Sequence, residues 1–295
     1  MLKVKKPVIN KFIFDEPYNL FLKSLKNRSL ETIGTYKRSL REFLVWSKSY
    51  KNFQFKVEDV EKYKLYLTSF KKLAPNSVST YLTALRQFFN FLTHNGTIIE
   101  NPALKVKAYV KSVTINKSLL SQNEIDKYVN SIIKTDERGY RDFALSKLIL
   151  FAGLQEIELV RANIGDYKNV EKKTFLFVQS KGKLKKESVI EIQKDVKQAI
   201  EDYLAYRRYA NDDEPLFMSA GNRTRGKRMT SRGIRERINM HLKNANLKKK
   251  QKLNITAYSL RHAAAKIYAT NGMKPEELQK KFRIGKLKTA LNYYN

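Results

Sequence analysis

The sequence predicts a mainly α protein of the α+β class, in which a helical domain precedes a mixed domain with a small antiparallel sheet. Apolar residues recur with the helical period of about 3.6 through the first half of the chain. Two short alternating segments flank a Lys-Gly turn in the second half, which is typical of a β-hairpin. The length of 295 residues exceeds what one core usually organises, so two domains are expected.

The first half contains three clear helical stripes. Ser29 can cap the first helix, whose apolar residues recur over 33–44. The second stripe covers residues 57–67. The third helix opens near Pro75, and Asn95-Gly96 stops it. These elements predict a small basic bundle of about four helices.

Helices also account for most of the second half. Ser121 can cap a helix that starts at the following residue or the next. Residues 139–153 form a long apolar stretch that ends at Gly153, which predicts a buried helix. Further helices are expected at 194–210, 230–245 and 256–271, with more toward the C-terminus.

A β-hairpin is expected between these helices. Residues 174–179 and 188–192 both alternate between apolar and polar side chains. The connecting segment SKGKLKKE places Gly182 at the centre of the turn.

Domain boundaries follow from the same patterns. Asn101-Pro102 begins an extended, Lys-bearing stretch, which predicts a linker between the domains. We therefore expect a basic arm at 1–15, a helical domain at 16–103, a linker at 104–117 and a mixed domain at 118–295.

The charge of the chain is strongly positive. It has 59 Lys and Arg against 28 Asp and Glu, a formal net charge of +31. The excess is net +13 over residues 1–112 and net +18 over the remainder. Two basic domains favour a long polyanion as partner, because neutralised phosphates release condensed counterions. The alternative is a Lys-rich surface that serves solubility alone.

Several classes of site are disfavoured by composition. The chain has no cysteine, and its three histidines are scattered, so we expect no metal site. No stretch approaches the roughly 18 consecutive apolar residues that span a membrane. The first residues lack the apolar run of a signal peptide. The expected location is the cytoplasm, with nucleic acid.

Four short motifs follow one another along the chain. They are AGLQEIEL at 152–159, SKGK at 180–183, YSLRHAAA at 258–265 and LKTALNYYN at 287–295. In this order, and on a chain of this charge, they resemble the tyrosine recombinases, or phage integrase family. The resemblance covers nearly the whole chain from about residue 16. It implies a SAM-like helical core-binding domain and a tyrosine recombinase catalytic domain that form a C-shaped clamp on DNA.

Four residues match the active site that the resemblance implies. Lys181 corresponds to the catalytic lysine of the hairpin turn, and Arg261 and His262 match the family's Arg and the His that follows it. Tyr293, which lies 32 residues after Arg261, aligns with the nucleophilic tyrosine.

The resemblance also implies a chemistry. The tyrosine oxygen attacks a DNA phosphodiester and forms a covalent phosphotyrosyl intermediate. Arginines bind the phosphate oxygens, the lysine protonates the leaving 5′ oxygen, and histidines support proton transfer. No cofactor or metal is implied. The implied partners are double-stranded DNA and further copies of the chain, as a dimer or tetramer on DNA.

Three positions depart from the family pattern. Gln155 stands where the first catalytic Arg is expected, Tyr258 replaces the leading His, and Ile284 replaces the third His or Trp. The nearby basic residues that could compensate are Arg161, Arg283 and Lys286. The chain could therefore be a weakened recombinase, a variant with other helper residues, or a DNA-binding relative that does not cleave.

Basic and polar side chains define the predicted DNA-contacting surface. In the helical domain they are Lys37, Arg38, Arg41, Asn76, Ser77, Thr80 and Arg86. In the second domain, residues 223–237 hold seven basic side chains in fifteen, and the predicted contacts are Arg223, Arg225, Lys227, Arg228, Arg232 and Arg235. Phosphate contacts of this kind position DNA rather than read its sequence. The alternative is a solvated basic helix face.

Alternatives also stay open for single residues. Lys181 could be an ordinary turn lysine, and His262 could bond backbone within the core. Tyr294 competes with Tyr293 as the nucleophile. A general basic packing protein, with little sequence preference and affinity that falls steeply with salt, is a further alternative for the whole chain.

Overall fold

The computed structural model describes residues 14–50, 53–109, 120–207, 211–247 and 255–294. The chain divides into two compact units, residues 1–114 and 115–295. Most of the basic arm expected at 1–15 and most of the linker expected at 104–117 lie outside the described residues.

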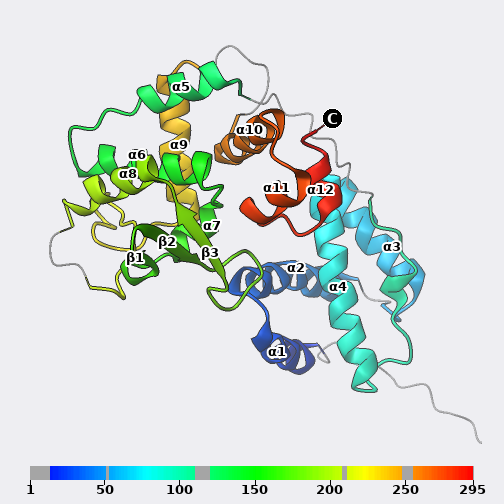
Figure 1. Cartoon of the computed structure of the whole chain (residues 1–295). Coiled ribbons are helices and arrows are strands. Elements are labelled where there is room, and N and C mark those ends of the chain that lie inside the picture. Colours follow the sequence, from blue (N-terminus) through cyan, green and yellow to red (C-terminus); the bar gives the residue numbers. More distant parts are fainter. Residues whose placement is uncertain (1–13, 51–52, 110–119, 208–210, 248–254, 295) are drawn as a thin grey trace, which may run out of the picture. The chain divides into compact units, whose positions relative to one another are not determined.

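The described part of the first unit contains four α-helices, as the sequence predicts (Figure 1). They are α1 (Asp15–Ser24), α2 (Leu30–Ser49), α3 (Val57–Leu65) and α4 (Pro75–His94). Short helical turns lie at Leu25–Asn27, Tyr66–Phe70 and Pro102–Leu104.

Local sequence explains where these helices begin and end. The Ser29 hydroxyl accepts a hydrogen bond from the Thr32 amide at 3.4 Å, so the predicted cap of α2 is confirmed. Pro75 occupies the first position of α4, where its missing N–H leaves no bond unmade. Gly96 has a φ of +68°, the left-handed conformation that ends α4 and that glycine adopts without strain.

An aromatic core holds the first unit together. Phe43 of α2, Tyr63 of α3 and Phe89 of α4 are fully buried. The Phe43 ring meets Tyr63 and Phe89 edge to face, at centroid distances of 5.2 and 5.6 Å. Such pairs contribute about 0.5–1.5 kcal/mol each beyond their buried area. This packing fixes the inner faces of the helices, so the outer face of α2 is presented to solvent.

The described part of the second unit combines helices with a small sheet (Figure 1). The helices are α5 (Gln122–Asn130), α6 (Glu137–Phe151), α7 (Glu156–Arg161), α8 (Lys194–Leu204), α9 (Ser231–Asn244), α10 (Ala257–Thr270), α11 (Pro275–Lys281) and α12 (Leu287–Leu291). A single 3-10 turn at Ile164–Asp166 leads into the sheet.

The sheet is antiparallel, with strand order β1-β2-β3. Its strands are β1 (Tyr167–Val170), β2 (Lys173–Val178) and β3 (Ser188–Ile192). The β2–β3 hairpin confirms the prediction, and in its register Phe177 pairs with Val189. β1 was not predicted, because its sequence YKNV is exposed over most of its length and shows no apolar alternation. The α+β class with a small antiparallel sheet is therefore confirmed.

Two helical features differ from the prediction. α8 ends at Leu204, although the pattern predicted a helix to residue 210. The Arg207 guanidinium donates to the Pro215 carbonyl at 2.8 Å and to Glu214 at 2.7 Å, which holds a turn where the helix was expected to continue. α7 was not predicted, because six residues are too few for a recognisable apolar stripe.

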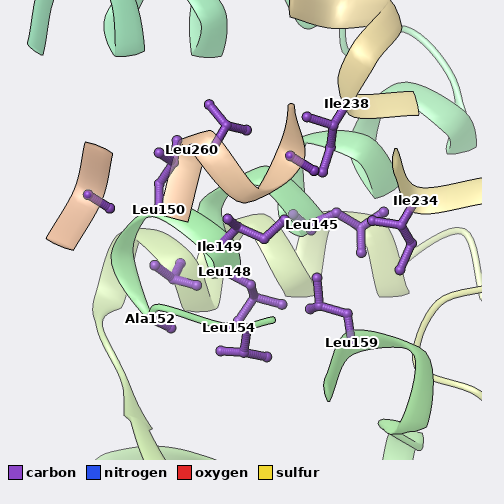
Figure 2. Packing of buried hydrophobic residues seen from close by; sticks show 14 of the residues in the cluster. Leu145, Leu148, Ile149, Leu150, Ala152, Leu154, Leu159, Ile234, Ile238 and Leu260 are labelled. Carbon is purple, nitrogen blue, oxygen red and sulfur yellow. The ribbon is translucent and has the colours of Figure 1, made fainter. Parts of the chain in front are cut away.

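The core of the second unit is built around α6 (Figure 2). Leu145, Leu148 and Ile149 of α6 are buried against Ile238 of α9 and Leu260 of α10. Full burial of such a side chain contributes about 1.5–3 kcal/mol. α10, which carries the YSLRHAAA motif, is thereby fixed against α6.

A buried carboxylate joins α6 to α9. Asp142 is 2% exposed and accepts hydrogen bonds from Arg141 at 2.8 and 3.0 Å, from Arg237 at 2.6 Å and from His241 at 2.9 Å. Burial disfavours its ionised form, but the bond to His241 and the two guanidinium groups hold the pKa of Asp142 below its usual value. The network fixes α9, whose opposite face carries Arg232 and Arg235.

Replacing Asp142 by Ala is expected to lower the free energy of unfolding by about 3–5 kcal/mol, because cationic donors would remain buried without their acceptor. Urea unfolding followed by circular dichroism measures this change. Asp195→Ala is the matched control, since Asp195 forms a half-exposed pair with Lys147 and should cost less than about 1 kcal/mol. Equal losses in the two variants would contradict the assignment of the Asp142 network as a structural anchor.

Candidate active site

Helix α10 brings three of the predicted site residues onto one face. Tyr258, Arg261 and His262 are spaced at i, i+3 and i+4, the spacing of neighbours on a helix surface. The amide of Thr256, which precedes the helix, donates to the Ser259 hydroxyl at 3.1 Å and orders its first turn. The Tyr258 ring meets the His262 ring edge-on at a centroid distance of 4.2 Å. Tyr258 is 52% exposed, whereas His262 and Arg261 are buried.

Tyr293 lies directly against this face. It follows α12, and its hydroxyl shares a hydrogen bond of 2.5 Å with Nδ1 of His262. Burial, with a smaller contribution from Tyr258, raises the pKa of Tyr293 to about 12, while Arg261 acts in the opposite direction. The phenol is therefore protonated at neutral pH, and it donates to Nδ1 in the imidazole tautomer that leaves Nδ1 without a proton. A hydroxyl that donates to an imidazole nitrogen is the arrangement of a nucleophile and its base.

Arg261 supplies a buried cation beside Tyr293. One terminal nitrogen, Nη2, donates to the Phe282 carbonyl, and the guanidinium lies 5.2 Å from the centroid of the Phe282 ring. Burial and the neighbouring Arg283 lower the pKa of Arg261 to about 10, so it stays charged at neutral pH. Its other terminal nitrogen, Nη1, is buried and has no hydrogen-bond acceptor among the described residues. A buried charged donor of this kind is matched by an anionic oxygen.

The AGLQEIEL segment places Gln155 at the start of α7. Gln155 is half-buried, and its backbone amide donates to the Glu158 carboxylate at 2.8 Å. Gly153 turns the chain between α6 and α7 with a φ of +60°. A Cβ at Gly153 would come within 2.9 Å of the Phe282 ring, so glycine is required by both conformation and space.

Gly153→Ala is expected to lower the free energy of unfolding by about 2–4 kcal/mol, because left-handed strain and overpacking against Phe282 add together. Gly182→Ala is the matched control. Gly182 has a φ of +83°, but a Cβ added there would meet nothing within 4 Å, so only strain of about 1–2 kcal/mol applies. Chemical unfolding of both variants measures the difference, and an equal cost would exclude a packing role for Gly153.

Lys181 lies on the β2–β3 turn and is exposed. The turn is closed by a hydrogen bond from the Lys183 amide to the Ser180 carbonyl at 3.0 Å, with Gly182 in the left-handed conformation. The structure thus brings together Tyr258, Arg261, His262 and Tyr293, and places Lys181 at the surface. The role of each as a site residue stays a prediction.

The other candidate residues in or near the motifs make different contacts. Ile284 is half-buried and packs against the core of the unit. The Tyr294 hydroxyl donates to the Met273 carbonyl, away from His262. Lys286 is exposed at the start of α12. Arg161 donates to the carbonyls of Gln179 and Ser180, at 3.4 and 3.2 Å.

Sequence reasoning gave no role to Glu158, which is fully buried beneath the site. Its bond to the Gln155 amide is one half of a capping box, and a Glu three residues after a helix cap is a recognisable signature of that motif. Its second partner, Arg283, forms a bidentate ion pair with it at 2.7 Å. The sequence named Arg283 only as a nearby basic residue, because no local pattern links positions 125 residues apart.

The predicted DNA-contacting residues of the first unit differ in their surroundings. Lys37, Arg38 and Arg41 are exposed on α2 and line a hollow of about 560 Å³. Asn76 is exposed at the start of α4, with Ser77 and Thr80 half-buried beside it. Arg86 instead donates to the carbonyls of Ala103 and Val106, at 2.9 and 2.5 Å, and holds that segment on α4.

In the second unit, too, most predicted DNA-contacting side chains are exposed, whereas one is bonded within the protein. Exposed predicted contacts are Arg223, Arg225, Lys227, Arg232 and Arg235. Arg228 donates to the carbonyls of Val160 and Ala162 and to the Asn163 side chain, at 2.7–3.0 Å. Arg86 and Arg228 therefore have structural bonds, and their contact with DNA remains a prediction.

Two kinds of feature are absent from the described residues. In those residues, no group of three or more His, Cys, Asp or Glu side chains is placed to hold a metal ion. No described helix is both long and apolar enough to cross a membrane.

Comparison with known proteins links this geometry to one family. Residues 119–295 match the model of the phage integrase family, and residues 19–95 match that of the phage integrase N-terminal SAM-like domain. The tyrosine recombinase XerC of Caldanaerobacter subterraneus subsp. tengcongensis is 32% identical over 180 residues, 60% of this chain and 46% of that protein. XerC of Thermodesulfovibrio yellowstonii is 27% identical over 283 residues, 92% of this chain and 88% of that protein.

Solved structures share the fold. The Tn1549 transposon integrase in complex with transposon right end DNA matches with a TM-score of 0.72 and 17% identity, over 95% of this chain and 94% of that one. A λ integrase dimer bound to a COC′ core site matches with a TM-score of 0.69 and 14% identity, over the same shares of the two chains. At these identities the match establishes the fold alone.

Proposed function

Because the chain belongs to the phage integrase family, we propose that it is a site-specific DNA recombinase that acts through a covalent phosphotyrosyl intermediate. One observation carries the proposal. The Tyr293 hydroxyl shares a hydrogen bond with His262 within a buried site, where Nη1 of Arg261 has no acceptor among the described residues. A nucleophile, a base and a cation suited to phosphate are thus held together by α10 and the segment after α12.

The proposed first step is a transesterification at a DNA phosphodiester. The Tyr293 oxygen attacks phosphorus while its proton passes to Nδ1 of His262. The bond from phosphorus to the 5′ oxygen breaks, and Lys181 donates a proton to that leaving oxygen. Arg261 binds a non-bridging oxygen through Nη1, where negative charge gathers in the transition state. Attack by the 5′ hydroxyl of a second strand then releases Tyr293 and completes the exchange.

DNA binding is proposed for both units. The exposed basic side chains of α2 and of residues 223–235 have the charge and exposure needed for phosphate contacts. Strand exchange needs two DNA sites, so we propose that the chain assembles on DNA as a dimer or tetramer. We propose that the chain acts on chromosomal or mobile-element DNA in the cytoplasm.

A second candidate function follows from the departures at Gln155, Tyr258 and Ile284. Loss of one preorganised donor lowers an enzyme's rate by about 10²–10³-fold, and an uncharged Gln155 also removes a cation. Under this alternative the chain binds DNA as a structural or regulatory factor and does not cut it. Ile284 favours this alternative, because its apolar side chain packs into the core and cannot donate a hydrogen bond.

A recombination assay distinguishes the two functions. The target site is first selected from a pool of random duplexes by repeated binding, and two copies are then placed on one plasmid. A recombinase resolves or inverts the segment between the copies. Specific binding with an unrearranged plasmid supports the structural factor instead.

A further inference from the structure

The carboxylate of Glu158 has four hydrogen-bond donors. Oε1 accepts from the Ser180 hydroxyl at 2.8 Å and from Nε of Arg283 at 2.7 Å. Oε2 accepts from the backbone amide of Gln155 at 2.8 Å and from Nη2 of Arg283 at 2.7 Å. Burial disfavours ionisation, yet the bonds and charge of Arg283 hold the pKa of Glu158 below its usual value. Glu158 is therefore an ionised anion with its acceptor capacity filled.

Most N–H groups of the Arg283 guanidinium are also used in hydrogen bonds within the protein. Besides Glu158, it donates through Nη2 to the Gly153 carbonyl at 2.6 Å and through Nη1 to the Lys281 carbonyl at 2.7 Å. These bonds use four of the five N–H groups of a guanidinium, and the ion pair balances its charge. Its backbone adopts a φ of +48°, which non-glycine residues rarely do. Arg283 is thus committed to the protein and is not free to serve as a second phosphate ligand in place of residue 155.

The bonds of this pair reach three segments that carry predicted site residues. Ser180 immediately precedes Lys181 on the hairpin turn. Gln155, whose backbone amide donates to Glu158, immediately precedes α7 after the turn at Gly153. The backbone on either side of Phe282 is fixed by the bonds of Arg283, and the Phe282 carbonyl is the acceptor that orients Arg261. Arg283 supplies the positive charge that faces the Glu158 carboxylate.

We propose that Arg283 is a positioning residue of the recombination site. Through Glu158 it fixes the turn that carries Lys181, and through the backbone of residues 281–283 it fixes the Phe282 carbonyl that orients Arg261. This inference rests on the proposed function for its catalytic consequence, but the positioning itself is a property of the free protein. Arg161 also holds this turn, because it donates to the carbonyls of Gln179 and Ser180.

The test compares Arg283→Gln and Arg283→Lys with wild type in the full chain. Arg207→Gln is the matched control, because Arg207 is also buried, pairs with one carboxylate and donates to backbone carbonyls, but lies outside this network. Three quantities are measured for each protein. They are amide hydrogen exchange of the free protein by mass spectrometry, equilibrium binding to the selected DNA site, and the single-turnover rate of covalent adduct formation on a nicked duplex.

Arg283→Gln is expected to speed exchange roughly tenfold over residues 179–184 and 281–284, where local opening becomes easier. Its adduct rate should fall about 100-fold, as misplacement near 1 Å does, while DNA affinity stays within about threefold because phosphate contacts dominate it. Arg283→Lys, which keeps the charge and one bond, should recover at least about a tenth of the wild-type rate. Arg207→Gln should change exchange only near residues 214–217 and leave the adduct rate within about threefold, because distant sites act independently.

Three results overturn the positioning role. They are unchanged exchange over 179–184 in Arg283→Gln, an unchanged adduct rate despite faster exchange, and an equal rate loss in Arg207→Gln. If wild type forms no adduct although it binds the site, the proposed cleavage fails, and the exchange data alone decide whether Arg283 positions the turn.

Discussion

Tyr293→Phe is expected to abolish covalent adduct formation on DNA. The change removes one oxygen and leaves a ring of the same shape in a buried position, so packing is preserved while the nucleophile is lost. The broken hydrogen bond to His262 should cost only about 1 kcal/mol of stability. The single-turnover yield on a nicked duplex, separated on a denaturing gel, measures the effect, and a gel shift checks that binding persists.

Tyr294→Phe is the matched control for this prediction. The Tyr294 hydroxyl donates to the Met273 carbonyl and has no place beside His262. Adduct formation should therefore survive in Tyr294→Phe. If Tyr294→Phe removed the adduct while Tyr293→Phe kept it, the assignment of the nucleophile would be wrong.

Arg261→Gln is expected to lower the adduct rate by at least about 10²–10³-fold. Arg261 is the buried cation beside Tyr293, and its Nη1 donor has no acceptor among the described residues. Gln at this position has a shorter side chain and brings no charge to the transition state. Arg261→Lys should also be impaired, because an ammonium cannot donate to Phe282 and to a phosphate in the planar geometry of a guanidinium.

The control for Arg261 is Arg232→Gln. Arg232 is exposed on α9, where it pairs with Glu236, so its loss should affect DNA affinity and salt dependence more than the adduct rate. Rapid-quench kinetics at saturating protein separate the two effects. An adduct rate that falls equally in both variants would show that general electrostatics, rather than a phosphate ligand at Arg261, controls the chemistry.

Most of the fold follows from local sequence. Ser29, Ser121 and Pro75 are strong helix-start residues, and the structure places each at the start of a helix. The hairpin was predicted because both strands alternate around Gly182. Elements without such patterns were missed. They are β1, whose residues are mostly exposed, and α7, whose Glu158 is bonded to the distant residues Ser180 and Arg283.

The candidate site could likewise be predicted only where a local sequence pattern links its residues. Tyr258, Arg261 and His262 lie on one helix, so a local motif was enough to group them. The match of Tyr293 by its spacing also agrees with the observed bond to His262. The pairing of Glu158 with Arg283 could not be predicted, because it depends on how α7 and the segment after α11 pack in space. The structural roles of Arg86 and Arg228 could not be predicted for the same reason. Both side chains donate to backbone carbonyls, and every residue type has such a carbonyl, so no sequence pattern marks the acceptor.

The geometry gives the departures from the family pattern different consequences. Tyr258 lies edge-on to His262 and can support its ring orientation. Ile284 packs with the core and contributes no polar group. Gln155 leaves Arg261 as the buried cation beside Tyr293, so under the proposed function we expect a slower reaction than at a site with two arginines.

The most direct test of the central claim is to trap and locate the covalent intermediate. Wild-type protein is incubated with its selected site carrying a 5′-bridging phosphorothiolate, because the sulfur leaves without protonation and cannot reverse the step. The adduct is digested with protease and nuclease, and mass spectrometry locates the attached nucleotide. The account predicts a nucleotide on Tyr293 in the C-terminal peptide. Specific binding without any adduct, or a nucleotide on another residue, would contradict it.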